Sequence, residues 1–108
     1  MDNTLQTLYN VILDRKSNPQ EGSYTCYLFE KGLDKILKKV GEESAETIIA
    51  AKNGVKSETV GEISDLIYHL LVMMADQEIP LSTVLEELER RGRKIGNLKQ
   101  FHTAEKDS

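Results

Sequence analysis

The residues of this chain best suited to chemistry fall in two short acidic clusters. The first contains Glu42, Glu43 and Glu46, and the second contains Glu62 and Asp65. Both clusters lie in segments whose apolar residues recur at helical spacing, and residues three or four apart are neighbours on a helix surface. Like charges at that spacing repel one another. A divalent cation would offset the repulsion, because hard cations such as Mg²⁺ bind oxygen ligands.

The alternative is that these carboxylates are ordinary solvated charges. Charged residues make up 30% of the chain, and charged side chains usually face water. A single glutamate pair would favour this alternative. Two pairs on consecutive helices favour a cation site instead, because a cation between the helices would have four protein groups to choose from.

Length and composition limit the possible classes of protein. A chain of 108 residues is expected to form one domain with a core of modest size. The hydrophobic fraction of 39% is slightly low, so a subunit interface would help to hide apolar surface. The net charge of −4 argues against a general nucleic-acid binder, whose affinity rests on a basic surface.

The single cysteine and the lengths of the apolar segments indicate the cellular compartment in which the protein is expected. Cys26 has no partner for an internal disulfide and is most simply a small apolar residue in a reducing compartment. The N-terminus has neither a basic start nor a long apolar run, so no signal peptide is expected. No apolar stretch reaches the roughly 18 residues that span a membrane. We expect a soluble, cytoplasmic protein.

The apolar periodicity predicts an all-α fold, an antiparallel helical bundle of four to five helices over residues 1–92. A polar C-terminal tail is expected over residues 93–108. Long helices are expected over residues 4–16, 33–52, 57–77 and 82–91. Residues 23–29 have the aromatic and β-branched content of a strand, but no partner strand is evident. We therefore predict a short helix here, capped by Ser23 and ended at Gly32.

Each of the two central helices carries an apolar stripe with a polar stripe beside it. The expected core stripes are Leu33, Ile36, Leu37, Val40, Ala45 and Ile48 on one helix, and Ile63, Leu66, Ile67, Leu70, Leu71 and Met74 on the next. The polar stripes are Lys35, Lys39, Glu43, Glu46 and Ala50 on the first, and Glu62, Asp65, His69, Val72 and Asp76 on the second. Antiparallel pairing through the short connection at 53–56 would let the acidic groups meet.

The acidic motif resembles the signature of the all-α nucleoside triphosphate pyrophosphatases, the MazG-type superfamily. Within that group the chain is similar to the phosphoribosyl-ATP pyrophosphatase family of histidine biosynthesis. The resemblance extends from about Leu5 to Arg91. It is carried by the segments Ser23-Tyr24-Thr25, Gly32-Leu33-Asp34-Lys35-Ile36, Lys39-Val40-Gly41-Glu42-Glu43 and Asp65-Leu66-Ile67-Tyr68-His69-Leu70-Leu71.

The resemblance implies a homodimer that uses Mg²⁺ to hydrolyse phosphoribosyl-ATP to phosphoribosyl-AMP and pyrophosphate. By position in the motif, it implies Glu43, Glu46, Glu62 and Asp65 as metal ligands. Either Glu42 or Glu46 would be the catalytic group that orients water, and the sequence does not choose between them. The chain is too short for the cyclohydrolase domain that is fused to this family in many organisms, so the stand-alone form is expected.

Lysines preceding the first acidic cluster are candidate phosphate ligands. Lys35 and Lys39 share the helical sector of Glu43, so they could contact phosphate oxygens beyond the metal. Lys38 lies elsewhere on the helix and is expected to face solvent. The alternative for all three is a solvated basic face. Similarly, Arg90 and Arg91 could reach a phosphate or could simply be favourable charge near a helix C-terminus.

Other candidates follow from the resemblance. Ser23 and Thr25 could place hydroxyl groups near the phosphates or ribose, although Ser23 could act only as a helix cap. His69 lies one turn after Asp65 and could orient a carboxylate or touch the substrate, although a lone histidine on a helix is more often structural. A subunit contact and a substrate contact are equally expected for Tyr68.

Two rival functions stay open. A house-cleaning pyrophosphatase of the same superfamily, acting on non-standard or deoxy nucleotides, would share the fold and the metal site and differ in the base and sugar pocket. A non-catalytic helical interaction module would not need the acidic clusters, because a packing surface gains nothing from carboxylates that repel one another.

Overall fold

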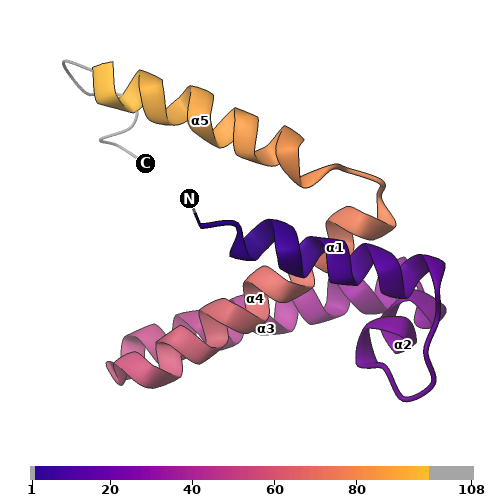
Figure 1. Ribbon diagram of the computed structural model, residues 1–108. Coiled ribbons are helices and arrows are strands. Elements are labelled where there is room, and N and C mark those ends of the chain that lie inside the picture. Colours follow the sequence, from indigo (N-terminus) through magenta and orange to yellow (C-terminus); the bar gives the residue numbers. More distant parts are fainter. Residues whose placement is uncertain (1, 98–108) are drawn as a thin grey trace.

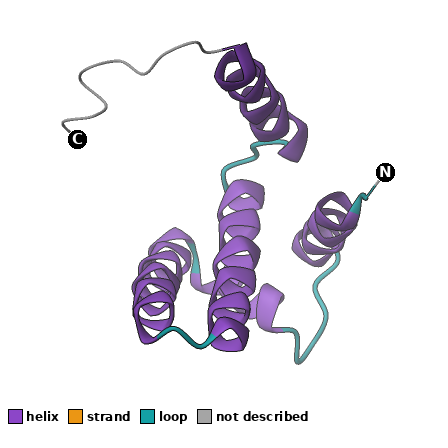
Figure 2. Ribbon diagram, turned by 90° about the vertical axis from the view of Figure 1, so that its left-hand side faces the viewer, coloured by secondary structure: helices purple, strands orange, loops and turns teal. Residues whose placement is uncertain are grey.

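A computed structural model describes residues 2–97, and five helices account for most of them (Figure 1). They are α1 (Thr4–Ser17), α2 (Tyr24–Lys31), α3 (Leu33–Asn53), α4 (Lys56–Asp76) and α5 (Leu81–Asn97). The described part of the chain contains no strand (Figure 2). The all-α prediction is therefore confirmed, and so is the helix expected after Ser23. The tail predicted from residue 93 begins inside α5, and from residue 98 onwards it lies outside the described residues.

Local sequence signals explain where α2 and α3 begin and end. The Ser23 hydroxyl accepts a hydrogen bond from the Cys26 backbone N–H at 3.1 Å and caps α2. Gly32 has φ of +93°, which lets the chain turn directly from α2 into α3. Gly54 ends α3 in the left-handed conformation, as the Asn53-Gly54 pair predicts.

The hydrophobic core lies at one end of the antiparallel hairpin formed by α3 and α4, where α1 and α2 pack against it (Figure 1). The buried cluster consists of Tyr9, Ile12, Leu28, Ile36, Leu71, Val72, Met74, Ala75 and Leu81. Two polar contacts fasten α1 to the end of α4. The Tyr9 hydroxyl donates to the Ile79 carbonyl at 2.5 Å, and Lys16 Nζ donates to the Ala75 carbonyl at 2.9 Å. The other end of the hairpin extends past α1.

The predicted core stripe of α3 is largely wrong. Ile36 is buried, but Leu37 is exposed and Ile48 is 70% exposed. The buried residues that follow Ile36 on α3 are Glu43 and Ala50, each seven residues further on. The helix therefore turns its polar stripe towards α4, and small Ala50 allows the two helices to approach closely.

The core stripe predicted for α4 is correct only in its second half. Leu71 and Met74 are buried as predicted, whereas Ile63 and Ile67 are exposed at 42% and 37%. The two halves of α4 differ because α1 packs against α4 near Leu71 and does not reach the first half of the helix (Figure 1). No other element of residues 2–97 covers Ile63 and Ile67.

Helix α5 departs from the rest of the molecule (Figures 1 and 2). It packs on the core through buried Leu81 and half-buried Val84, at its first turn. Its arginines pair within the helix, because Glu87 binds both Arg90 and Arg91. These hydrogen bonds lower the pKa of Glu87 to about 2. The pairing favours the alternative in which Arg90 and Arg91 are helix-stabilising charges over a phosphate contact.

A search of the described residues finds no helix with the length and apolar content needed to cross a membrane.

Candidate metal centre

Three carboxylates from two helices converge between α3 and α4. Glu43 extends from the middle of α3, and Glu62 and Asp65 extend from the second and third turns of α4. One oxygen of each lies within 4.8 Å of the others. The antiparallel pairing of the two helices brings these residues together, as their spacing in the sequence predicts. Three oxygen ligands at this separation suit a hard divalent cation.

Two oxygen atoms in this group lack hydrogen-bond partners. Glu43 is only 6% exposed, and its Oε2 is buried without a partner among the described residues. Oε1 of Glu62 is in the same situation. A buried carboxylate oxygen without a partner is costly, and native proteins rarely leave one. A cation beside both atoms would satisfy them, so the residues present fit a bound metal ion.

The electrostatics of Glu62 point the same way. Burial is the largest cause of the raised pKa of Glu62, and the neighbouring carboxyl groups of Glu46, Glu43 and Asp65 raise this pKa further. Glu46 is exposed and lies near enough to Glu62 to influence its pKa. The structure thus brings together Glu43, Glu62 and Asp65, three of the four carboxylates that the motif suggests, with Glu46 near Glu62. The role of all four as metal ligands stays a prediction.

The raised pKa of Glu62 predicts how the stability of the metal-free protein depends on pH. The folded state binds this proton more tightly than the unfolded chain, where the group titrates near its ordinary value of 4.5. The free energy of unfolding should therefore fall as the pH rises from about 4.5 through the folded-state pKa. Chemical denaturation at several pH values would measure this, and Glu62→Gln should flatten the slope. An identical slope in the variant would contradict the expectation.

Lys39 and Glu42 form the border of the acidic group. Lys39 Nζ lies 3.3 Å from Oε1 of Glu42 and 3.7 Å from Oε1 of Glu43. Burial lowers the pKa of Lys39, but the hydrogen bond with Glu42 and the attraction of Tyr24, Glu42 and Glu43 outweigh it and raise the pKa. Lys39 is therefore placed next to the candidate centre as predicted. Glu42 is exposed and paired with Lys39 instead of facing the other carboxylates.

His69 connects this helix pair to α2. The ring is buried, and its Nδ1 lies 2.7 Å from the backbone carbonyl of Asp65. A carbonyl oxygen only accepts, so Nδ1 carries the proton. In the neutral ring Nε2 then accepts from the Tyr24 hydroxyl at 3.1 Å. The histidine thus bonds to the backbone carbonyl of Asp65 and not to its carboxylate, and a contact of His69 with the substrate stays a prediction.

The remaining candidates have partners within the protein. The Thr25 hydroxyl bonds to the hydroxyl of half-buried Tyr68. Burial is the main cause of the raised pKa of Tyr68. Ser23 caps α2, which is the alternative to substrate binding that the sequence allows for this residue. Lys35 Nζ lies 5.9 Å from the centre of the Tyr27 ring. Substrate binding by Ser23, Thr25 and Lys35 stays a prediction.

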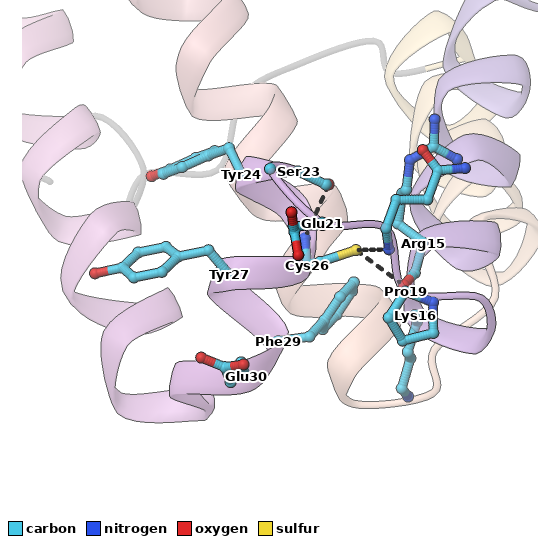
Figure 3. Close-up of a pocket in the computed structure, with 12 residues that line it drawn as sticks. Arg15, Lys16, Pro19, Glu21, Ser23, Tyr24, Cys26, Tyr27, Phe29 and Glu30 are labelled. Atoms are coloured by element: carbon cyan, nitrogen blue, oxygen red, sulfur yellow. Dashed lines mark hydrogen bonds between the residues drawn. The ribbon is translucent and has the colours of Figure 1, made fainter.

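A separate hollow of about 930 Å³ lies between the end of α1, the following loop and α2, and none of the four carboxylates lines it (Figure 3). Tyr24 and Tyr27 are among the residues that line it, and the sequence predicts a role for neither of them. Their spacing of three residues on a short helix, between two lysine-containing segments, was the available signal.

Comparison with known proteins identifies the family. The family model described as phosphoribosyl-ATP pyrophosphohydrolase matches residues 5–92. A phosphoribosyl-ATP pyrophosphatase of Clostridium novyi is 55% identical over 101 residues, 92% of each chain. One from Listeria monocytogenes is 59% identical over 91 residues, 84% of this chain and 87% of the relative. The histidine biosynthesis bifunctional protein HisIE of Thermoanaerobacter pseudethanolicus is 68% identical over 83 residues, 77% of this chain and 38% of that protein. The chain therefore belongs to the phosphoribosyl-ATP pyrophosphohydrolase family.

Proposed function

We propose that Glu43, Glu46, Glu62 and Asp65 hold Mg²⁺, and that this enzyme of histidine biosynthesis hydrolyses phosphoribosyl-ATP there to phosphoribosyl-AMP and pyrophosphate. The observation that carries the proposal is the pair of buried, unpartnered oxygens on Glu43 and Glu62, beside Asp65. Family membership supports the reaction.

The reaction breaks the bond between the α and β phosphates of a highly anionic substrate. Mg²⁺, when bound, neutralises charge on phosphate oxygens and acidifies a water molecule. Lys39 supplies a fixed positive charge at the border of the site, because its contacts with Glu42 and Glu43 orient the ammonium group. His69 orients the turn of α4 that carries Asp65, through the backbone carbonyl. Glu42 and Glu46 both remain candidates for the group that orients the attacking water.

We also propose that two copies of the chain associate through the uncovered part of the α3–α4 hairpin. Leu37 and Ile48 on α3, with Val60, Ile63 and Ile67 on α4, are large apolar residues that face solvent in the isolated chain. On α4 the exposed residues continue the stripe that α1 covers further along. Pairing two hairpins would bury both stripes in a four-helix arrangement.

A substrate panel with and without Mg²⁺ tests the function. We expect phosphoribosyl-ATP to be hydrolysed with a higher kcat/KM than deoxynucleoside triphosphates, and chelation by EDTA to abolish the reaction, as measured by pyrophosphate release. Faster hydrolysis of a deoxynucleotide would favour a house-cleaning enzyme. Hydrolysis that persists in EDTA would contradict the proposed Mg²⁺ site.

A further inference from the structure

Two tyrosines on α2 form a partly exposed aromatic surface next to the carboxylates. Tyr24 and Tyr27 are 45% and 39% exposed, although large aromatic side chains are usually buried. Their ring centres lie 6.0 Å apart and their planes differ by 25°. Figure 3 shows both rings leaving α2 on the same side, away from Cys26 and Arg15. Their orientation leaves ring surface available to a planar ligand.

Two contacts connect this surface to the candidate metal centre. The Tyr24 hydroxyl is held by Nε2 of His69, whose other nitrogen is bonded to the Asp65 carbonyl. The Tyr24 ring lies against Tyr68 and His69 as well, with centres 6.2 Å and 5.8 Å away. Tyr24 is therefore fixed in position at the edge of the site.

Beyond Tyr27, positive charge collects. The ammonium groups of Lys31 and Lys35 lie 5.8 Å and 5.9 Å from the centre of its ring. Neither lysine forms an ion pair within residues 2–97. Both cations would attract an anion bound near this ring. The order along this surface is thus carboxylates, aromatic rings and free lysines.

We propose that Tyr24 and Tyr27 bind the purine base of the substrate, and that Lys31 and Lys35 bind the phosphate of its added phosphoribosyl group. The proposal rests on the proposed function, which places the triphosphate at the carboxylates. In the substrate, the phosphate of the added phosphoribosyl group lies on the opposite side of the base from the triphosphate. The triphosphate can therefore lie at the carboxylates, the base at the tyrosines and the other phosphate at the lysines. A base stacked on Tyr27 displaces the flexible lysine side chains from the ring towards that phosphate. The lysines then distinguish phosphoribosyl-ATP from ATP.

Binding of the product phosphoribosyl-AMP, measured by calorimetry, tests the aromatic part without turnover. Stacking on one aromatic ring accounts for roughly tenfold or more in affinity, so Tyr27→Leu should weaken binding about tenfold. Tyr27→Phe keeps the ring and should bind as the wild type does. Equal affinity in Tyr27→Leu and the wild type would overturn the proposal. The stabilisation of each variant by Mg²⁺ should stay unchanged, which separates this surface from the metal centre.

Steady-state kinetics test the lysines. In Lys31→Gln, kcat/KM for phosphoribosyl-ATP should fall about tenfold through KM, by loss of a charge-assisted phosphate contact, while kcat/KM for ATP stays the same. Lys38→Gln removes an exposed lysine of α3 that lies outside this surface and should change neither value. A parallel loss for both nucleotides in Lys31→Gln would contradict the assignment. If the wild type failed to hydrolyse phosphoribosyl-ATP, the proposed function would fall, whereas the binding experiment would still judge the aromatic surface.

Discussion

Replacing Glu62 with glutamine should reduce kcat/KM for phosphoribosyl-ATP by about 10²–10³-fold, since a metal ion supplies several kcal/mol of charge stabilisation. The same change should raise the melting temperature of the metal-free protein. The carboxylate is repelled by Glu46, Glu43 and Asp65, and its pKa is raised by burial and by those neighbours. A neutral amide of the same shape removes that repulsion. Pyrophosphate release and thermal unfolding in EDTA measure the two effects.

A variant that loses activity but gains thermal stability identifies a functional carboxylate, because replacing a structural carboxylate would lower the melting temperature. Glu58→Gln is a matched control on the same helix, because Glu58 is exposed in the first turn of α4. Its charge is favourable at a helix N-terminus, so the control should lower the melting temperature slightly and leave activity unchanged. Full activity in Glu62→Gln, or a lower melting temperature in EDTA, would contradict the account of the site.

If two chains associate as proposed, replacing Ile48 with glutamate should convert that dimer into monomers. Ile48 is 70% exposed in the single chain, and the proposed association would bury it against the partner. Each dimer would then bury two unpaired carboxylates, which costs several kcal/mol and raises the dissociation constant at least about a hundredfold. Light scattering coupled to size-exclusion chromatography measures the mass in solution.

A control for this change is Val11→Glu on α1, where another large aliphatic side chain is 45% exposed. It lies outside the proposed interface and should leave the mass of a dimer unchanged. A wild-type chain that is monomeric at micromolar concentration would contradict the proposed association. So would an Ile48→Glu variant that keeps the dimer mass.

The sequence predicts which residues share a helix face, and this explains why the convergence of carboxylates between α3 and α4 could be predicted. Glu43 and Glu46 lie one turn apart, as do Glu62 and Asp65, and a short connection pairs their helices. These two facts are enough to bring Glu43, Glu62 and Asp65 together. Glycine signals at Gly32 and Gly54 likewise predict the helix ends, because few other residues tolerate their φ values.

Periodicity does not say which of two adjacent faces will be covered. On α3, the apolar stripe with Ile48 looks like the core face, yet the stripe with Glu43 and Ala50 faces α4. On α3 the choice depends on how the helix packs against α4, and on α4 it depends on how far α1 extends, and both are tertiary facts. Contacts such as Tyr24 with His69 were also out of reach, because they depend on the angle at which α2 meets the hairpin.

The most direct test of the account is a calorimetric titration of Mg²⁺ into the wild type, Glu43→Gln and Glu58→Gln. The account predicts that the wild type and Glu58→Gln bind Mg²⁺, because Glu43, Glu62 and Asp65 each offer an oxygen to one shared cation. It predicts that Glu43→Gln binds at least about tenfold more weakly, since one ligand charge is gone. Equal Mg²⁺ affinity in Glu43→Gln and the wild type, or no Mg²⁺ binding by the wild type, would contradict a cation held between α3 and α4.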